Sequence, residues 1–348
     1  MSPKKKCDCV IVGAGPAGST LAYYLAKRGF VVLIIDKHRF PRDKSCAGGV
    51  PLRARALCEF SIDETVENRI TQLAFTYRLE NLHLVENTQP FAYTVRRDRF
   101  DHLLLKNAEA AGATVRAGEA PTAVELRKDC VVLTTSQNSY CSRILVGADG
   151  VRSKVAELAG FRVKRRAIFT LQTKVDGVAH SDMMRIDFGS FPYGYRWSFP
   201  SGSSTLVGVG GLKVSTDLDG HLREWLDYCA PGISTPRVER FAIPLGGILQ
   251  RVAKERVCLI GDAGNMTHPL TGEGIYYAMT SAILAGLAVE ESAQTGDFSF
   301  HNYQRLIREE LYPEFRKWHF LAGLFYQFPR IGYECLIKRN QKLLNYFT

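Results

Sequence analysis

The alternation of apolar and polar positions near the N-terminus predicts a strand, a glycine-rich turn, a helix and a second strand. Residues 8–12 form an apolar run typical of a buried parallel strand, and residues 17–28 carry apolar side chains at helical spacing up to Gly29. A second apolar run follows at residues 31–35. Such a unit, about thirty residues long, begins a dinucleotide-binding fold.

Later segments are expected to return to this first domain. A helix should begin at Asp98, whose carboxylate would cap it, and end at Gly112. The buried parallel pattern resumes at residues 257–260, and residues 274–293 have the pattern of a long helix. The first domain is therefore discontinuous. Short strands are also expected at residues 114–116, 130–135 and 143–146.

The pattern between about residues 165 and 244 is different. Apolar and polar residues alternate there, and Gly, Pro and Ser separate the runs. Alternation of this kind favours an antiparallel sheet with one covered face, inserted into the first domain. The alternating runs are residues 168–175, 184–188, 205–209 and 238–243.

Composition limits the class of protein but does not identify a binding partner. The formal net charge of +10 suits nucleic acid, anionic lipid headgroups or an acidic cofactor, and the basic run at residues 4–6 reads as a solvated leader. Nine scattered cysteines without Cys-x-x-Cys spacing indicate a reducing cytosol and no metal site, with Cys7 and Cys9 packed in a strand. No apolar run is long enough for a membrane-spanning helix, so we expect a soluble or peripheral protein.

The clearest chemical motif is the turn Gly13-Ala14-Gly15-Pro16-Ala17-Gly18, which fits G-x-G-x-x-G between a strand and a helix. One glycine makes the turn, one admits a pyrophosphate and one allows close helix packing, while the helix N-terminus supplies N–H donors. Asp36, followed by Lys37, ends the second strand where a carboxylate usually accepts ribose hydroxyls. These residues predict a dinucleotide site, but they do not separate NAD from FAD.

Residues near the end of the first domain favour FAD. Gly261-Asp262-Ala263-Gly264 follows an apolar strand, and a Pro-Leu-Thr-Gly-Glu-Gly segment then opens a helix at Gly274. Asp262 would hold the ribityl chain, and N–H groups from Gly272 to Ile275 would neutralise negative charge on a reduced flavin ring. An NAD enzyme does not need this second helix end.

At these motifs the chain resembles the geranylgeranyl reductase family, within the larger group of aromatic-hydroxylase-like flavoproteins. The first glycine motif, the middle segment from Gly147 through Asp149 to Ser153, and Gly261-Asp262 match the three FAD motifs of the larger group. Residues 95–101 resemble its Arg-x-x-Phe-Asp helix start, which implies that Arg97 lies near the FAD pyrophosphate.

Two further segments resemble the narrower family. Lys44-Ser45-Cys46-Ala47-Gly48-Gly49 resembles its Cys-Gly-Gly loop beside the flavin, although Ala47 stands where glycine is commoner. The run from Tyr193 to Pro200 resembles the Tyr-x-Trp-x-Phe-Pro signature of the prenyl pocket. Tyr195 and Trp197 would share one face of a strand, either as an aromatic wall over a ligand or as packing within the sheet. Cys46, Tyr195 and Trp197 are the expected catalytic residues.

The resemblance implies an α/β fold: a Rossmann-like, aromatic-hydroxylase-like FAD-binding domain with an inserted antiparallel-sheet substrate domain and a helical C-terminal tail. The expected boundaries are residues 1–65, 96–164 and 245–298 for the FAD-binding domain, residues 66–95 and 165–244 for the substrate domain, and residues 299–348 for the tail.

The implied reaction is saturation of an isolated carbon–carbon double bond in an isoprenoid chain by hydride from reduced FAD. Cys46, Tyr193 and His268 are candidate proton donors, and His268 is better explained as a packing or hydrogen-bonding residue. The external reductant is either NAD(P)H or a ferredoxin, since the sequence has no second G-x-G-x-x-G fingerprint for a resident nicotinamide.

Two alternatives remain open. The same FAD motifs serve monooxygenases and halogenases, which act through a flavin hydroperoxide, but Asn265 stands where many hydroxylases have histidine, and Tyr195 with Phe199 departs from the halogenase Trp-x-Trp-x-Ile-Pro run. A flavin-binding protein without turnover is the third interpretation. The tail from Tyr312 combines aromatic and basic residues, which suit either peripheral docking on anionic lipid or helices that close the substrate domain.

Overall fold

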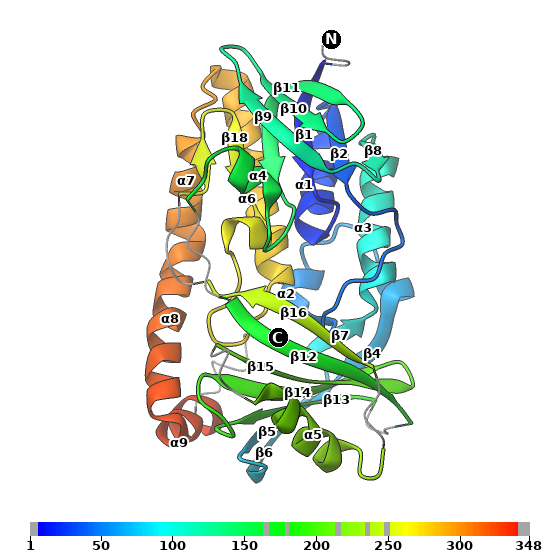
Figure 1. The fold of residues 1–348 in the computed structure, drawn as a ribbon, viewed down its shortest axis with the longest axis vertical. Helices are drawn as coiled ribbons and strands as arrows, with labels where there is room; N and C mark the ends of the chain where they lie inside the picture. The colour runs from blue at the N-terminus through cyan, green and yellow to red at the C-terminus, as the bar shows by residue number, and fades with distance from the viewer. Residues whose placement is uncertain are drawn as a thin grey trace. The chain divides into compact units, whose positions relative to one another are not determined.

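The computed structural model describes residues 6–162, 167–177, 181–212, 217–233, 237–246 and 251–339 (Figure 1). The chain forms two compact units. Unit 1 comprises Met1–Arg42, Asp101–Arg165 and Pro244–His319, and unit 2 comprises Asp43–Phe100, Arg166–Ile243 and Phe320–Thr348. The helices α3 (Arg97–Ala110) and α8 (Tyr312–Gln327) contribute residues to both units. Lys4, Lys5 and Lys342 lie outside the described residues.

Unit 1 is built on an eight-stranded sheet whose central strands are parallel and buried. The order is β17-β18-β11-β1-β2-β8, and β10 and β9 continue antiparallel from β11. Helices cover the sheet, with Leu21 of α1 and Ala282 of α6 in the same core as Ile11 of β1. The strands are β1 (Lys6–Val12), β2 (Val32–Asp36), β8 (Thr114–Ala117), β9 (Pro121–Leu126), β10 (Val131–Thr135), β11 (Ser139–Gly147), β17 (Ala253–Lys254) and β18 (Val257–Leu259); the helices are α1 (Pro16–Ala26), α4 (Lys154–Leu158), α6 (Ile275–Thr295) and α7 (His301–Leu306).

Unit 2 is built on a seven-stranded sheet in the order β16-β12-β15-β14-β13-β5-β6. It also contains a three-stranded sheet in the order β3-β7-β4. The amphipathic helix α5 (Leu218–Cys229) covers one face of the larger sheet (Figure 1). Its residues Leu222 and Trp225 belong to the same apolar core as Val207 of β15. The strands are β3 (Gly49–Pro51), β4 (Val66–Ile70), β5 (Gln72–Tyr77), β6 (Glu80–Glu86), β7 (Ala92–Val95), β12 (Ala167–Asp176), β13 (Met183–Phe188), β14 (Gly194–Ser201), β15 (Ser204–Gly211) and β16 (Val238–Pro244).

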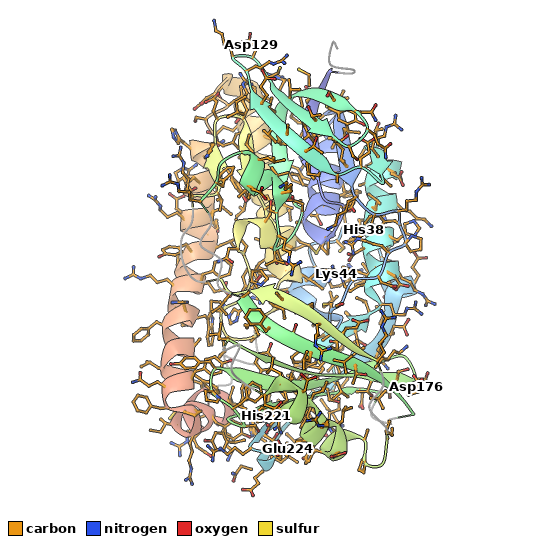
Figure 2. The ribbon with its side chains drawn as sticks, in the orientation of Figure 1. His38, Lys44, Asp129, Asp176, His221 and Glu224 are labelled. Atoms are coloured by element: carbon orange, nitrogen blue, oxygen red, sulfur yellow. The ribbon has the colours of Figure 1, made fainter. Side chains whose placement is uncertain are left out.

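Helix α5 is also joined to the sheet through buried polar groups. Arg196 of β14 is fully buried, pairs with Asp187 of β13 at 3.7 Å, and contacts His221 and Glu224 of α5. Figure 2 labels these two residues of α5. The indole N–H of Trp225 donates to the Trp197 carbonyl at 2.8 Å. Both sets of contacts fix the helix to β14, the strand that carries the aromatic signature.

The α/β class and the parallel first sheet are as expected, but two details of the expected elements differ. Strand β13 pairs with β5 in parallel, so the second sheet is mixed. This happens because β5 comes from an earlier part of the chain and does not join β13 through a hairpin. Helix α3 begins at Arg97, so Asp98 lies in its first turn and is not the cap.

The observed units divide the chain differently from the expected domains. Residues 43–65 and 96–100 belong to unit 2, whereas the expected FAD-binding domain included them. The tail is shared: the Tyr303 hydroxyl donates to the Leu259 carbonyl in unit 1, and the Tyr333 hydroxyl donates to the Phe75 carbonyl in unit 2. The short helices α2 (Leu52–Arg55) and α9 (Pro329–Gly332) belong to unit 2. Within the described part of the chain, no helix has the length and apolar character needed to cross a bilayer.

The turn after β1 provides a stability prediction. Gly13 has φ +105°, and a Cβ there would lie well inside van der Waals contact with the Ala148 carbonyl. Gly112 has φ +111° with no atom within 4 Å of an added Cβ. We expect Gly112→Ala to lower the free energy of unfolding by about 1 kcal/mol and Gly13→Ala by at least about 3 kcal/mol, because only the second adds a backbone clash to the same strain. Urea unfolding of the FAD-free protein measures both; equal losses would contradict the clash.

Candidate active site

The carboxyl ends of three neighbouring parallel strands bring the three motifs together in unit 1. Val12 pairs with Gly147, and Gly147 pairs with Leu259, so the last residues of β1, β11 and β18 lie side by side. Each strand is followed at once by one motif. In open α/β sheets a ligand binds at this edge, where the loops that follow the strands meet.

The glycine turn after β1 has a packing that is compatible with the predicted phosphate site. Cβ atoms at Gly13 and Gly18 would collide with the carbonyls of Ala148 and Gly13, respectively. At Gly15 the nearest atom to an added Cβ is Nη2 of Arg42, at 3.5 Å, so the backbone there is open. The first and third glycines are therefore required by packing, and the second leaves space for a phosphate to approach.

The N-terminus of α1 is suited to an anion. Gly15 is the N-cap and has no side chain to cap the helix, Pro16 occupies the first turn, and the first turn has no acidic residue. The first helical bond runs from the Ser19 N–H to the Gly15 carbonyl, so Ala17 and Gly18 present N–H groups that have no helical acceptor. These donors and the positive end of the helix dipole fit a pyrophosphate.

Asp36 holds the turn as well as ending β2. Its carboxylate accepts the Ala14 N–H at 2.8 Å and the His38 N–H at 2.8 Å, and the side chain is buried. A carboxylate has lone pairs beyond these two bonds, so the predicted ribose contact is compatible with this geometry. Lys37 is exposed, and its predicted cofactor contact stays a prediction.

Arg42 is a candidate cofactor ligand that the sequence reasoning missed. Its Nη2 forms a 3.1 Å ion pair with Asp101, which is fully buried in α3, and its buried Nη1 has no hydrogen-bond partner. Since Nη2 also lies beside Gly15, the guanidinium stands next to the open turn. The only sequence signal was the buried acid in the Arg-x-x-Phe-Asp segment, which requires a cation. Arg97, the residue expected there, is half-buried at the start of α3 in unit 2.

The middle and late motifs pack closely against the first. The Asp149 carboxylate accepts from Ser153 and from the Lys154 and Val155 N–H groups, so it holds the start of α4, and burial raises its pKa. A Cβ on Gly261 would lie 3.1 Å from the Ala17 Cβ and 3.3 Å from the Ala278 Cβ. The late loop therefore fits between the N-terminal turns of α1 and α6.

The loop before α6 is held by buried hydrogen bonds. His268 is fully buried; its N–H donates to the Glu273 carbonyl, its carbonyl accepts the Gly272 N–H, and its Nδ1 accepts the Leu270 N–H at 3.3 Å. An Nδ1 that accepts a hydrogen bond belongs to the neutral imidazole. His268 thus shapes the loop, in line with the hydrogen-bonding role expected from the sequence.

This loop leads into the N-terminus of α6. Gly274 is the N-cap without a side-chain cap, and Ile275 is the first helical residue. Glu273 accepts the Tyr276 N–H at 2.8 Å, while Asp262 accepts the Thr267 hydroxyl at 3.2 Å and lies 3.5 Å from a Cβ built on Gly274. Asp262 and the start of α6 are therefore adjacent, as a ribityl and ring-edge site requires.

The expected catalytic residues come together within unit 2. Tyr195 and Trp197 lie on one face of β14, with ring centroids 5.8 Å apart, and Phe188 of β13 lies 5.9 Å from Tyr195. Trp197 is 4% exposed, whereas Tyr195 is only half-buried. Burial, and then the neighbouring Cys46, raise the pKa of Tyr195, so its hydroxyl is protonated at neutral pH.

The Cys46 loop is pinned to β7. The Gly48 N–H donates to the Cys46 Sγ at 3.4 Å, and the Gly48 carbonyl accepts the Val95 N–H at 2.9 Å. Gly48 has φ +77°, and a Cβ there would collide with the Val95 carbonyl. Ala47 is half-buried beside it. Only glycine fits at position 48, whereas alanine at position 47 is accommodated.

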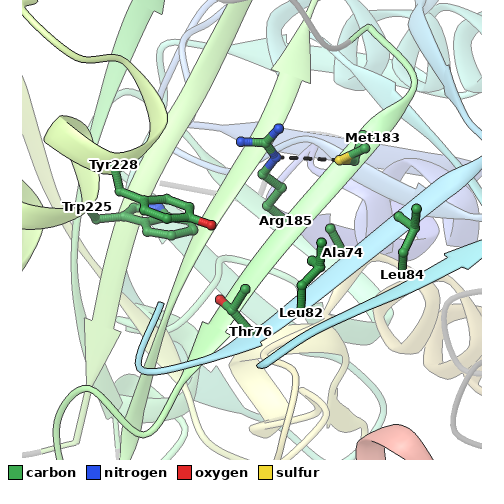
Figure 3. Close-up of a pocket in the computed structure, with 8 residues that line it drawn as sticks. All are labelled: Ala74, Thr76, Leu82, Leu84, Met183, Arg185, Trp225 and Tyr228. Atoms are coloured by element: carbon green, nitrogen blue, oxygen red, sulfur yellow. Dashed lines mark hydrogen bonds between the residues drawn. The ribbon is translucent and has the colours of Figure 1, made fainter. Parts of the chain in front are cut away.

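A cavity of about 150 Å³ lies on the α5 side of the seven-stranded sheet, opposite the face that carries Tyr195 and Trp197 (Figure 3). Trp225 and Tyr228 of α5 stack at 5.3 Å along its edge, and Arg185 points into it with Nε donating to the Met183 sulfur at 3.4 Å. Arg185 and Ile186 alternate along β13, and Ile186 pairs with Trp197. The sheet therefore separates this cavity from Tyr195 and Trp197.

Comparisons with known proteins identify the family. Residues 6–185 match the family described as FAD binding domain, and residues 249–311 match the squalene epoxidase family. A menaquinone reductase of Mycobacterium tuberculosis is 32% identical over 82% of this chain and 77% of its own length. The chain belongs to the geranylgeranyl reductase-like FAD-dependent oxidoreductases. A digeranylgeranylglycerophospholipid reductase of Methanocaldococcus jannaschii is 29% identical over 88% of this chain and 83% of its own length.

Solved structures of lower sequence identity share the fold. A geranylgeranyl bacteriochlorophyll reductase-like protein of Thermoplasma acidophilum has a TM-score of 0.85 at 22% identity, covering 98% of this chain and 92% of that one. A flavin-dependent brominase variant has a TM-score of 0.80 at 20% identity, covering 98% and 94%. The fold is therefore common to reductases and halogenases, and it does not choose between their reactions.

FAD affinity should depend on Arg42. We expect Arg42→Met and the double variant Arg42→Met/Asp101→Asn to raise the FAD dissociation constant roughly ten- to a hundredfold, because a charge-assisted bond to phosphate contributes about 1.5–3 kcal/mol. The double variant leaves no buried carboxylate unpaired. Titration of FAD-free protein with FAD measures this, and the exposed Arg39→Met serves as the control. If the double variant binds FAD as tightly as the wild type, Arg42 does not contact the cofactor.

Proposed function

We propose that this FAD-dependent oxidoreductase saturates isolated carbon–carbon double bonds in the isoprenoid chain of a lipid. The observation that carries the proposal is the cluster of Cys46, Tyr195 and Trp197 in unit 2, within a chain whose flavin motifs are assembled in unit 1. Relatives named for digeranylgeranylglycerophospholipid and for menaquinone support the substrate class, since both compounds carry isoprenoid chains.

The chemistry divides between the cofactor and the side chains. FAD, when bound and reduced, supplies a hydride. Tyr195 and Trp197 present ring faces that stabilise positive charge developing on an alkene carbon, and they exclude water from it. That charge would arise as the Cys46 Sγ–H donates a proton to the other alkene carbon, and the cationic carbon would accept the hydride. The product then gains two hydrogen atoms, and the thiolate is reprotonated from solvent.

The external reductant is proposed to be a transient donor. NAD(P)H or a ferredoxin would deliver two electrons for each double bond. The only dinucleotide fingerprint in the sequence is the one at residues 13–18, which the flavin would occupy. A donor that binds and leaves is therefore preferred to a resident nicotinamide.

The exposed side of the tail suggests that the protein docks on the membrane that contains its lipid substrate. Phe320, Leu324, Phe328 and Ile331 are 66%, 41%, 52% and 63% exposed, at intervals of three or four residues. On the opposite side Phe325 packs at 5.1 Å from Phe188 in unit 2. Arg330 and Arg339 are exposed nearby. An apolar stripe beside cations fits peripheral docking on an anionic membrane, while the buried side anchors the tail to unit 2.

Turnover of prenyl lipids tests the reaction. Chemically reduced enzyme, without oxygen, should add two mass units per double bond to geranylgeranyl lipids or menaquinone. Trp197→Leu and Tyr195→Leu should lower kcat at least roughly tenfold with flavin still bound. Tyr228→Leu, on the α5 side of the sheet, should behave as wild type. Absence of any mass gain with prenyl lipids would overturn the proposal, and substrate-dependent oxygen consumption with a hydroxylated product would favour the monooxygenase.

Vesicle binding tests the docking stripe. The triple variant Phe320→Ser/Phe328→Ser/Ile331→Ser should lose most binding to phosphatidylglycerol vesicles in co-sedimentation, because each buried apolar side chain contributes about 1.5–3 kcal/mol. Leu82→Ser/Leu84→Ser removes two other exposed apolar side chains of unit 2 and should bind normally. Equal binding by the triple variant and wild type would eliminate this surface.

A further inference from the structure

Gln172 occupies the middle of β12 and connects two of the proposed catalytic residues. Its side chain is 3% exposed. Its Oε1 accepts the Trp197 indole N–H at 3.3 Å, and its Nε2 donates to the Cys46 backbone carbonyl at 3.3 Å. One buried amide thus links β12, β14 and the loop between residues 43 and 49. All three segments belong to unit 2.

The connection depends on a glycine, Gly208, in the strand between β12 and β14. Gln172 pairs with Gly208 of β15, and Gly208 pairs with Trp197 of β14, so the two side chains lie two strands apart. That separation is about 10 Å between backbones. A Cβ on Gly208 would collide with the indole ring. The indole therefore lies across Gly208, and this orientation brings its N–H within reach of Gln172.

The chemistry of this link is specific to a primary amide. The indole N–H is only a donor and the Cys46 carbonyl is only an acceptor, so the connecting group must accept with one end and donate with the other. Gln does both at this length. Glu has no donor when ionised, and Met, which is similar in size, has no donor and only a weak acceptor in its sulfur.

We infer that Gln172 is a positioning residue that fixes the Trp197 indole and the Cys46 loop relative to each other. The inference rests on the proposed function for its catalytic meaning, because Trp197 would face the alkene and the Cys46 thiol would supply the proton. The Gly48 N–H to Cys46 Sγ bond lies two residues beyond the carbonyl that Gln172 holds. Gln172 therefore acts on the reaction through the placement of both groups, without contact with the reacting atoms.

The matched variants are Gln172→Met and Thr170→Val. Thr170 is 2% exposed, two residues before Gln172 in β12, and its hydroxyl donates to the Phe241 carbonyl at 2.6 Å. Each substitution removes buried polar contacts from the same strand at similar side-chain volume. Both should lower the midpoint of thermal unfolding by a few degrees.

The alkylation rate of the Cys46 thiol distinguishes a positioning role of Gln172 from a contribution to protein stability. Alkylation of Cys46 by iodoacetamide, followed by peptide mass spectrometry, should change at least about threefold in Gln172→Met and stay unchanged in Thr170→Val. Exposed Cys335 provides the internal standard, since its rate should be the same in every variant. Wild-type alkylation of Cys46 in Gln172→Met would overturn the inference, whatever its effect on unfolding.

The catalytic consequence is measured separately. Gln172→Met should lower kcat roughly tenfold with KM changed less, because misplacement affects the reaction more than lipid binding. In a Trp197→Phe background, which lacks the indole N–H, the kcat loss from Gln172→Met should shrink. Full additivity of the two losses would contradict coupling through the amide. If wild-type protein reduces no prenyl lipid but the alkylation shift is present, the proposed function fails and the positioning role of Gln172 stands.

Discussion

The close backbone approach between Gly13 and the Ala148 carbonyl is the constraint on which unit 1 depends. It sets the distance between the turns after β1 and β11, and the Gly261 loop then packs directly on Ala17. Because β1, β11 and β18 are parallel and in register at their last residues, three segments far apart in the chain share one sheet edge. The N-termini of α1 and α6 are brought together by these contacts, so one anionic cofactor can use both.

Unit 2 achieves its geometry in a different way. Its aromatic residues are placed by strand register, by α5 behind the sheet and by side-chain hydrogen bonds. Trp197 is held on its carbonyl by Trp225 and on its indole nitrogen by Gln172. Backbone packing leaves little room for variation in unit 1, whereas exchange of a few side chains would reshape unit 2. This contrast agrees with a fold shared by reductases and halogenases.

Local signals made much of this structure predictable from sequence. The glycine turn after β1 and the start of α6 depend on residue types at fixed short spacing, and both helices begin within one residue of the expected position. The pairing of β13 with β5, the Arg42–Asp101 ion pair and the Gln172 link each join residues distant in the chain, and no local pattern encodes them. The start of α3 was misplaced by one residue because Asp98 is a good cap by type, while the capping position depends on backbone geometry. The residue roles at the flavin and the substrate stay predictions.

The ion pair between Arg42 and Asp101 has a consequence for cofactor recruitment. A guanidinium on a free, flexible side chain loses rotational freedom when it captures a diphosphate, and that loss weakens association. Here the buried carboxylate already immobilises the cation beside Gly15 before any nucleotide arrives. The side chain of Arg42 is therefore already ordered when the protein folds, so a diphosphate that contacts its second nitrogen would lose less affinity to the ordering of this side chain.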